Sequence, residues 1–436
     1  MTSITDPSPG ASSQSTEDFP LSSVPETARK SMISLAPILA GFTLYSGTLF
    51  AGGLVGPSFQ FWGRRQRPDL VGLILLSNLI LGLYAAFLGF IAGNTGLTTV
   101  LMARFSFGSV GSRWVDFILG FTQIGWYAWG SALMAQLLNS LAGVPESWNW
   151  LIILFFTYGF CSTAYMGYKA MDWLSRIAVP AMILLMVLSL SVAAGDVGGF
   201  AGLQAQAIGD PLPVNVAITI VVGTFVSGGT QATNWSRFAK SGKAGFIATL
   251  IAFFLGNGFL IFSGAFCAKV YGEPDIVKVM ATQGLLVWGL ILFFFNMWTT
   301  QDNTIYAFSI AGSNMFRTRK RTLLVLGGAT FALVLALGGI YEMLVQYLIL
   351  LGTFIPPIGG IIMADYWVNR GGEFPALSEP QPAFNWAGII AYVAASAIAY
   401  FTNASGWGIV PLNGIVSALV IYVVLTKLIP APQSQS

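Results

Sequence analysis

Histidine is absent from this chain of 436 residues, and ionised side chains are scarce. Charged residues make up 8% of the chain, whereas a soluble protein carries about a quarter. So few charges cannot cover a compact globule of this length, which excludes a soluble protein. Without histidine there is no imidazole base, proton relay or imidazole-bound metal. The net charge of +3 provides no basic stripe for nucleic acid.

Cysteine is rare as well. The two cysteines, Cys161 and Cys267, lie in separate apolar runs, which favours packing residues over a disulfide or a thiol site. Residues 1–28 are rich in Ser, Thr and Pro and predict a disordered tail. They lack the basic start and short apolar core of a signal peptide. We also expect a short tail at 431–436, which leaves 29–430 as the main domain.

Uninterrupted apolar segments dominate that remainder. A membrane-spanning helix needs about 20 such residues. Windows free of Asp, Glu, Lys and Arg cover 31–63, 70–103, 117–145, 147–168, 177–195, 211–236, 244–268, 279–301, 322–341, 343–364 and 380–426. The last window is long enough for two helices with a turn near Asn403 to Pro411, so the sequence predicts twelve transmembrane helices. Helices satisfy their own backbone in lipid, and these runs are too continuous for alternating barrel strands.

The distribution of positive charge predicts the orientation of the helices. With a cytoplasmic N-terminus and twelve crossings, 15 of the 20 Lys and Arg face the cytoplasm, including the Arg317–Arg321 cluster. The other five lie outside: Arg64, Arg65, Arg67, Lys269 and Lys278. The Arg64–Arg67 group goes against the rule locally. We nevertheless expect both termini in the cytoplasm.

Glycine punctuates the first and the sixth predicted helix, within residues 41–53 and 223–230. Glycine costs about 1 kcal/mol in a helix interior relative to alanine, and unwound backbone inside a membrane is tolerated where it lines a cavity. Breaks at matching positions predict two inverted repeats, 31–195 and 211–369, followed by two helices within 380–430, with a transport site near the bilayer midplane. The other interpretation is that these glycines allow close helix packing.

Two predicted helices carry candidate binding residues. In the third predicted helix, Gln123 and Trp126 share a face. The indole could stack on a flat ligand while the amide forms hydrogen bonds with the ligand's edge. Alternatively, the Gln is bonded to a neighbouring helix and the Trp fills space. In the eighth, Asn296, Thr299, Thr300 and Asn303 form a polar stripe of neutral oxygens that suits a small hard cation. Asp302 lies deep in the same helix, where a carboxylate is either functional or paired with a neighbour.

Five groups of motifs follow one another along the chain: Ala28-Arg-Lys-Ser31, Gly96-Leu-Thr-Thr99 with Ala103-Arg-Phe-Ser-Phe-Gly108, Thr122-Gln-x-Gly-Trp126, Trp298-Thr-Thr-x-Asp-Asn303, and Ile355-Pro-Pro-x-Gly-Gly360 with Ala364-Asp-Tyr366. In their order and spacing, over about residues 23–430, they resemble the bacterial cytosine permeases of the nucleobase–cation symporter family. The resemblance implies an all-α, LeuT-like fold of 5+5 inverted repeats plus two helices. It also implies sodium-coupled uptake of cytosine across the inner membrane by alternating access, without catalytic residues or an organic cofactor.

The same resemblance implies a residue set for each ligand. The base would lie between Trp126 and Phe225, and its edge would be read by Gln123, Ser227, Asn296 and Gln301. Sodium would be bound by the carbonyl groups of Gly41 and Leu44 and by Asn296, Thr299 and Thr300. Asn296 belongs to both sets and would link the two ligands.

Two departures from the family leave the cargo open. Gln301 stands where those cytosine permeases carry Asn, and Thr224 replaces a Ser. Hydroxymethylpyrimidine, a purine, allantoin or a hydantoin remains an alternative cargo, and proton coupling through Asp302 an alternative to sodium.

Other functional classes fit less well. A channel needs a continuous polar lining, and the chain shows two polar patches; an enzyme needs a nucleophile–base pair or a metal cluster. A sensor that binds without transporting is compatible with the same residues. We expect a nucleobase, sodium and lipid as partners and a protein that functions as a monomer.

Overall fold

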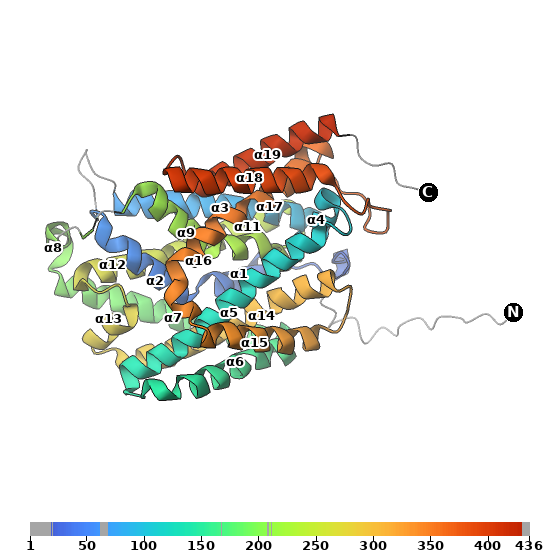
Figure 1. Ribbon diagram of the computed structural model, residues 1–436. Coiled ribbons are helices and arrows are strands. Elements are labelled where there is room, and N and C mark those ends of the chain that lie inside the picture. The colour runs from blue at the N-terminus through green and yellow to red at the C-terminus, as the bar shows by residue number, and fades with distance from the viewer. Residues whose placement is uncertain are drawn as a thin grey trace, which may run out of the picture.

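The computed structural model describes residues 19, 21–61, 69–166, 168–206, 209–210 and 212–429. Long helices run between the two ends of a bundle, and Figure 1 shows α1 starting and α19 finishing toward the same end. Within the described residues there is no β-strand; the extended contacts are two isolated bridges, Lys30 to Ala239 and Gln60 to Asp69. The predicted all-α class is confirmed.

The helices follow the predicted spans in order. The first half contains α1 (Met32–Thr43), α2 (Ser46–Val55), α3 (Leu70–Thr95), α5 (Ser112–Ala142), α6 (Asn149–Met166) and α7 (Tyr168–Asp196). The second half contains α9 (Val214–Gln231), α10 (Thr233–Ser236), α11 (Gly242–Ile251), α12 (Gly258–Tyr271), α14 (Leu286–Met315), α15 (Arg321–Leu337), α16 (Leu344–Phe354) and α17 (Pro356–Ala364). The chain ends with α18 (Trp386–Ser405) and α19 (Val410–Leu428), and the connections contain the short helices α4 (Thr99–Phe107), α8 (Gly199–Ala205) and α13 (Ile276–Thr282). Two π-helical turns, Ala252–Asn257 and Asp365–Asn369, follow α11 and α17.

Each predicted window thus contains a helix or a broken helix. In the described part of the chain, eight helices are long and apolar enough to cross a membrane, and the bent α1–α2 pair makes nine if it is one span. Three further helices are not among these: α5 and α14, which are long but carry polar candidate residues, and α15, which has 17 residues. The structure is therefore that of a multi-pass helical bundle, and the number twelve stays a prediction.

Polar caps and glycines mark where these helices begin and end. The side chains of Ser31, Thr98 and Asn385 each accept the backbone N–H three residues later, at the starts of α1, α4 and α18. Gly96 and Gly406 follow α3 and α18 with φ of 71° and 68°, a left-handed conformation that favours glycine. These boundaries are encoded locally.

The break predicted in the first span is present, and the one predicted in the sixth is wrong. Leu44 and Tyr45 are non-helical, and α1 and α2 meet at a bend of 56°. In contrast, α9 continues without interruption through 223–230, and its helix ends only at Ala232.

Close packing explains the glycines of α9. A methyl group on Gly223 would lie 2.3 Å from the carbonyl oxygen of Leu348 in α16, and one on Gly228 would lie 2.9 Å from the Phe42 ring of α1. Both distances are too short for a carbon contact. These glycines therefore serve the alternative role considered from the sequence, that of letting neighbouring helices approach.

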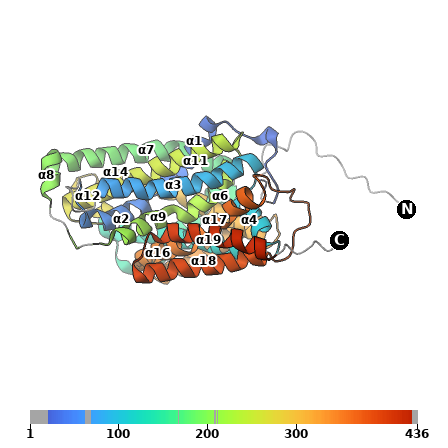
Figure 2. The same ribbon diagram turned by 90° about the horizontal axis from the view of Figure 1, so that it is seen from above.

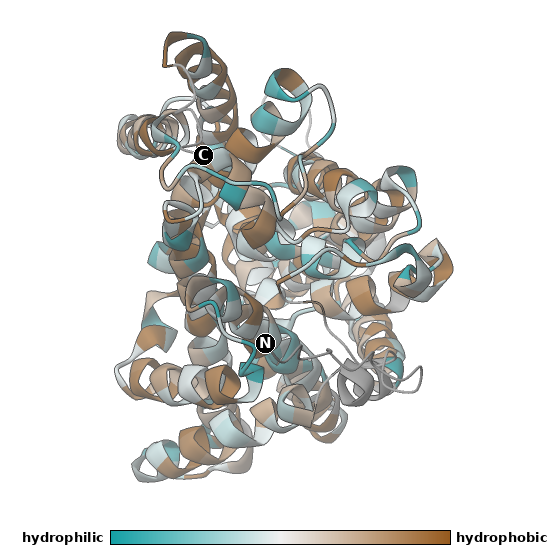
Figure 3. Ribbon diagram, turned by 90° about the vertical axis from the view of Figure 1, so that its right-hand side faces the viewer, coloured by the Kyte–Doolittle hydropathy of each residue, from teal (hydrophilic) through white to brown (hydrophobic). Residues whose placement is uncertain are grey.

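The bundle consists of two groups of helices and an outer pair. One group contains α5, α6, α14 and α15; the other contains α2, α3, α9, α11 and α12. The pair α18 and α19 packs against α17 and lies on the side opposite α7 and α1 in Figure 2. Apolar segments reach the periphery in the end-on view of Figure 3, as lipid contact requires. The α9–α10 segment is 94% buried within its most apolar window and lies at the centre.

Some predictions fall on residues outside the described ranges. These are most of the predicted N-terminal tail, the Arg64, Arg65 and Arg67 group, and the tail at 431–436. The last residues before α1 are described and form a short 3₁₀-helix, Glu26–Ala28. Just before it, Val24 is buried and donates its backbone N–H to the carbonyl oxygen of Gly96 at 2.9 Å.

Candidate functional site

The break between α1 and α2 is bonded to a side chain of α14. The Asn296 amide donates to the Leu44 carbonyl oxygen at 2.5 Å, and it accepts from the Ser46 backbone N–H at 3.0 Å and from the Ser46 hydroxyl at 2.5 Å. Asn296 is completely buried. Buried peptide groups without partners are costly, and a broken helix leaves several of them. Asn296 therefore replaces the hydrogen bonds that the break removes.

Neutral oxygen atoms gather beside this break. The last carbonyl groups of a helix have no partner within it, and α1 ends at Thr43, so the carbonyl of the buried Gly41 is one of these. On the adjacent α14, the hydroxyls of Thr299 and Thr300 donate to the Asn296 carbonyl oxygen at 2.8 and 3.1 Å, which leaves their lone pairs able to accept. Carbonyl and hydroxyl oxygens together suit a small hard cation.

Acidic and thiol ligands offer no rival metal site in the part of the chain that the structure describes, where no three or more Cys, Asp or Glu side chains form a group that could hold a metal. The neutral oxygens at the break are therefore the candidate cation ligands.

A small cavity lies next to the break, among α1, α5, α9 and α14. It is lined by Phe42, Tyr45, Gln123, Trp126, Thr224, Phe225, Ser227, Gly228, Thr300 and Thr304. Five of the predicted site residues, Gln123, Trp126, Phe225, Ser227 and Thr300, are thus brought together from three helices. The volume open to a water-sized sphere is about 10 Å³, room for about one water molecule. A heterocycle enters only if lining side chains move.

Tyr45 separates the two predicted stacking rings. Its ring centroid lies 5.4 Å from that of Trp126 and 6.3 Å from that of Phe225, edge-on to both at 89° and 81°. On its other side, Trp126 contacts Tyr347 of α16 at 5.3 Å, and the Tyr347 hydroxyl donates to the Thr122 carbonyl oxygen at 2.5 Å. A base between Trp126 and Phe225 therefore requires Tyr45 to swing away.

The two candidate glutamines have different surroundings. Gln123 lines the cavity, is 2% exposed, and its Nε2 has no hydrogen-bond partner among the described residues. Gln301 is absent from the lining; its Nε2 donates to the Tyr127 carbonyl oxygen at 2.6 Å, and the side chain packs on Gly130 of α5. Gln123 is thus available to a ligand, while Gln301 joins α14 to α5.

Asp302 points away from the cavity, toward α6. Its Oδ2 accepts from the Thr163 hydroxyl at 3.0 Å, and that hydroxyl also accepts from the Trp298 indole N–H at 3.1 Å. Asp302 is fully buried, and its Oδ1 has no partner in the described structure. The observed contacts therefore make it part of the α6–α14 interface.

Three lining residues were not singled out from the sequence. Phe42, Tyr45 and Thr304 lie in helices where aromatic and hydroxyl side chains are common, so residue type gives no signal. For Tyr45 the available signal was its position inside the predicted break, since a residue in unwound backbone at membrane depth faces a cavity.

Comparison with known proteins identifies the family. The model for the family of permeases for cytosine/purines, uracil, thiamine and allantoin matches residues 24–425. The cytosine permease of Escherichia coli K12 is 35% identical over 414 residues, which cover 94% of this chain and 95% of that protein. The cytosine permease of E. coli O157:H7 gives the same values.

Solved structures show the fold. Mhp1, a nucleobase-cation-symport-1 family transporter, closed and with bromovinylhydantoin bound, matches with a TM-score of 0.79 at 18% identity, covering 94% of this chain and 96% of Mhp1. Its inward-facing form also gives 0.79, at 17% identity, covering 97% of each chain. The predicted LeuT-like fold and the prediction of a transporter in place of an enzyme are confirmed. By the extent of its match to the family model and to its curated relatives, this chain belongs to the family of permeases for cytosine/purines, uracil, thiamine and allantoin.

Proposed function

We propose that this permease imports cytosine, or a closely related nucleobase, together with sodium ions, by alternating access across a bacterial inner membrane. The observation that carries the proposal is the helix break bonded to Asn296, with an aromatic cavity and neutral carbonyl and hydroxyl oxygens beside it. Broken helices near the midplane are where transporters of this architecture bind substrate and coupling ion.

Stacking and an unpaired amide account for base binding. Base-on-aromatic stacking on Trp126 or Phe225 contributes about 1–3 kcal/mol and is tolerant of the base. Selectivity then comes from hydrogen bonds, for which the Gln123 Nε2 and the Ser227 hydroxyl are placed at the cavity. A site with buried polar groups favours its ligand by about ten-thousandfold over analogues that leave those groups without hydrogen-bond partners.

Sodium would supply the driving force. The carbonyl groups of Gly41 and Leu44 and the side chains of Asn296, Thr299 and Thr300 would contribute its ligands. A monovalent cation that crosses about 100 mV gains roughly 2.3 kcal/mol. Uptake is driven if ion and base bind the same outward-open state, and the family resemblance assigns Asn296 to both residue sets.

The orientation follows from charge. With α1 starting and α19 finishing toward one end of the bundle, placing that end in the cytoplasm puts 15 of the 20 Lys and Arg there. We therefore propose that both termini are cytoplasmic and refer below to this end as the cytoplasmic end.

One observation favours another heterocycle as the cargo. Thr224, which stands where the cytosine permeases named above carry a Ser, lines the cavity and adds a methyl group to its wall, which changes the shape of the space open to a base. A purine, allantoin, a hydantoin or hydroxymethylpyrimidine is therefore the alternative, and Asp302 would be the proton carrier if protons replace sodium.

Uptake into proteoliposomes tests both parts. We expect saturable uptake of radiolabelled cytosine that requires an inward sodium gradient and is inhibited by unlabelled cytosine more than by uracil, adenine, allantoin or hydantoin. Equal uptake in choline buffer would refute sodium coupling. Stronger inhibition by another heterocycle would reassign the cargo without affecting the coupling result.

A further inference from the structure

An apolar groove runs along the outside of the bundle between α5 and α18, away from the transport cavity. Its walls include Trp114 of α5, Phe354 of α16, and Tyr392, Val393 and Phe401 of α18, and it encloses about 790 Å³. Trp114 and Val393 are 54% and 61% exposed. Within α18, from Ile389 to Phe401, the groove follows the helix for about 18 Å at 1.5 Å per residue, slightly more than the roughly 15 Å depth of one leaflet.

The cytoplasmic end of this groove is closed by backbone pairing. The loop before α18 bonds to the turn between α4 and α5: the Asn385 N–H donates to the Phe107 carbonyl oxygen at 2.9 Å, and the Val110 N–H to that of Ala383 at 2.8 Å. Gly108, with φ of 91°, lies at this junction, where a methyl group would come 2.7 Å from the Ala383 oxygen. The two walls are therefore fixed relative to each other.

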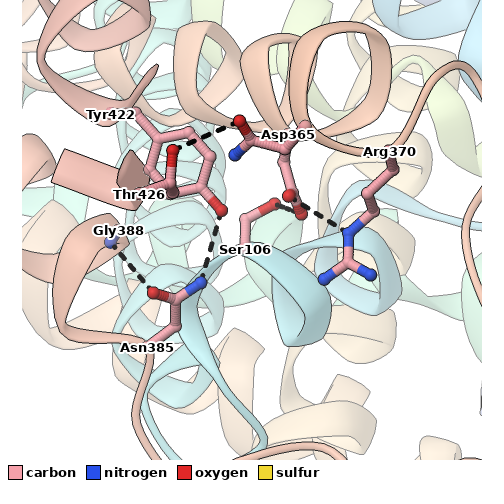
Figure 4. A network of polar contacts seen from close by, with 8 residues as sticks. Ser106, Asp365, Arg370, Asn385, Gly388, Tyr422 and Thr426 are labelled. Carbon is pink, nitrogen blue, oxygen red and sulfur yellow. Dashed lines mark hydrogen bonds and ion pairs between the residues drawn. The ribbon is translucent and has the colours of Figure 1, made fainter. Parts of the chain in front are cut away.

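Side chains behind the junction add to its rigidity (Figure 4). The Asn385 amide donates to the Tyr422 hydroxyl at 3.3 Å, which ties α18 to α19. Next to it, Asp365 accepts from the Ser106 hydroxyl at 2.9 Å and pairs with Arg370 at 3.1 Å. These bonds hold the residues at the cytoplasmic end of the groove in place.

Positive charge gathers at the same end. The Arg317 guanidinium donates to the carbonyl oxygen of Ser109, next to the groove residue Val110, at 2.7 Å, and both it and Arg104 donate to the Asn314 side-chain oxygen. Arg113, beside Trp114, is exposed, and its guanidinium forms no hydrogen bond or ion pair with any described residue.

The Arg317 guanidinium interacts with those of both Arg104 and Arg113. Burial, followed by the charge of Arg317, lowers the pKa of Arg104 to about 10. Burial also lowers the pKa of Arg317; the charge of Asp116 opposes this shift and that of Arg113 adds to it. The neighbouring Asp116 is buried and accepts from the Asn314 amide at 2.5 Å. The carboxyl group of Asp116 therefore accompanies three guanidinium groups, and the groove opens beside this excess of positive charge.

We propose that the groove binds an anionic phospholipid of the cytoplasmic leaflet, with its phosphate at Arg113 and Arg317 and an acyl chain along α18. The leaflet follows from the proposed orientation; the site itself does not depend on the transported substrate. Aromatic side chains mark the interfacial depth at which a phosphate lies, since Trp114 stacks on Phe117, and Phe384 on Trp386. Basic pockets between helices on the cytoplasmic side bind acidic headgroups, at about 1 kcal/mol per cation.

Two matched pairs of variants test the site. Arg113→Gln removes the free cation, and Lys240→Gln removes an exposed cation from the α10–α11 connection, on the side of the bundle opposite α18. Val393→Trp fills the groove, and Val416→Trp adds the same bulk at a site on α19 that is 58% exposed.

The readout is the lipid that stays bound when protein from vesicles of equal phosphatidylglycerol and phosphatidylcholine is analysed by native mass spectrometry. We expect the wild type to retain phosphatidylglycerol preferentially and Arg113→Gln to lower that preference about fivefold, which corresponds to about 1 kcal/mol. Val393→Trp should lose the lipid, and both controls should match the wild type.

Three outcomes would overturn the proposal. They are equal retention of the two lipids by the wild type, equal retention by Arg113→Gln and Lys240→Gln, and a lipid-free dimer that cross-links through position 393. The last would assign the groove to a second copy of the chain. None of these readouts depends on transport, so the outcome is independent of the proposed cargo.

Discussion

Replacing Asn296 by alanine removes all three hydrogen bonds that join α14 to the break between α1 and α2. The Leu44 carbonyl and the Ser46 N–H are then left without the partners that they have at 2.5 and 3.0 Å. An unsatisfied buried polar group costs about 1–3 kcal/mol, so the two together disfavour the broken conformation by about 2–6 kcal/mol. At about 1.4 kcal/mol per factor of ten, the equilibrium constant between the broken conformation and its alternatives falls at least about thirtyfold.

Ser46→Ala is the graded counterpart. It removes only the hydroxyl, while both backbone groups keep Asn296 as their partner. One lost hydrogen bond of about 1 kcal/mol predicts a decrease of about fivefold. Asn303→Ala is the control on the same helix, because its amide donates to the Thr299 carbonyl oxygen within α14 and its removal leaves no group of the break unpaired.

The assay is initial-rate uptake of radiolabelled cytosine under a sodium gradient, normalised to protein in the membrane. We expect kcat/KM to fall at least about thirtyfold for Asn296→Ala, about fivefold for Ser46→Ala, and less than about twofold for Asn303→Ala. If Asn296→Ala kept half of the wild-type rate, or if Asn303→Ala lost as much, the inference that Asn296 stabilises the break would be refuted.

Three further outcomes are expected. Trp126→Ala should lower kcat/KM for cytosine by about 5- to 150-fold, the equivalent of about 1–3 kcal/mol of stacking, whereas Trp126→Phe should retain most of it; normal saturable uptake by the alanine variant would eliminate the stacking model. Thr299→Ala should raise the sodium concentration for half-maximal uptake about tenfold or more, because hydrogen-bond-like contacts to a charge are worth about 1.5–3 kcal/mol; an unchanged sodium dependence would argue against this ligand. Tyr45→Phe should raise the thermal midpoint, since the buried Tyr45 hydroxyl has no partner in the described structure, whereas Tyr84→Phe, which loses a bond of 2.8 Å to Thr230, should lower it. A lower midpoint for Tyr45→Phe would show that its hydroxyl is paired.

Much of the fold and part of the site followed from residue order. Lipid demands long apolar segments, so charge-free windows located the helices, and caps such as Asn385 and Gly96 act over three or four residues and are visible locally. Gln123 and Trp126 share a face because they are three residues apart on a helix, and the structure places both at the cavity.

Contacts between distant segments account for the remainder. The first and the sixth spans both contain paired glycines. The helix opens between α1 and α2, where Asn296, some 250 positions away, supplies new hydrogen bonds, whereas α9 is continuous and its glycines allow the close approach of Leu348 and Phe42. Gln123 and Gln301 are the same residue type in comparable helices, and which one reaches the cavity depends on how each helix is rotated against its neighbours. The position of the Tyr45 ring between Trp126 and Phe225, which makes it a candidate binding-site residue, is visible only in the tertiary structure. Local sequence encodes burial in lipid and the ends of helices, whereas a binding site depends on long-range partners that no single segment contains.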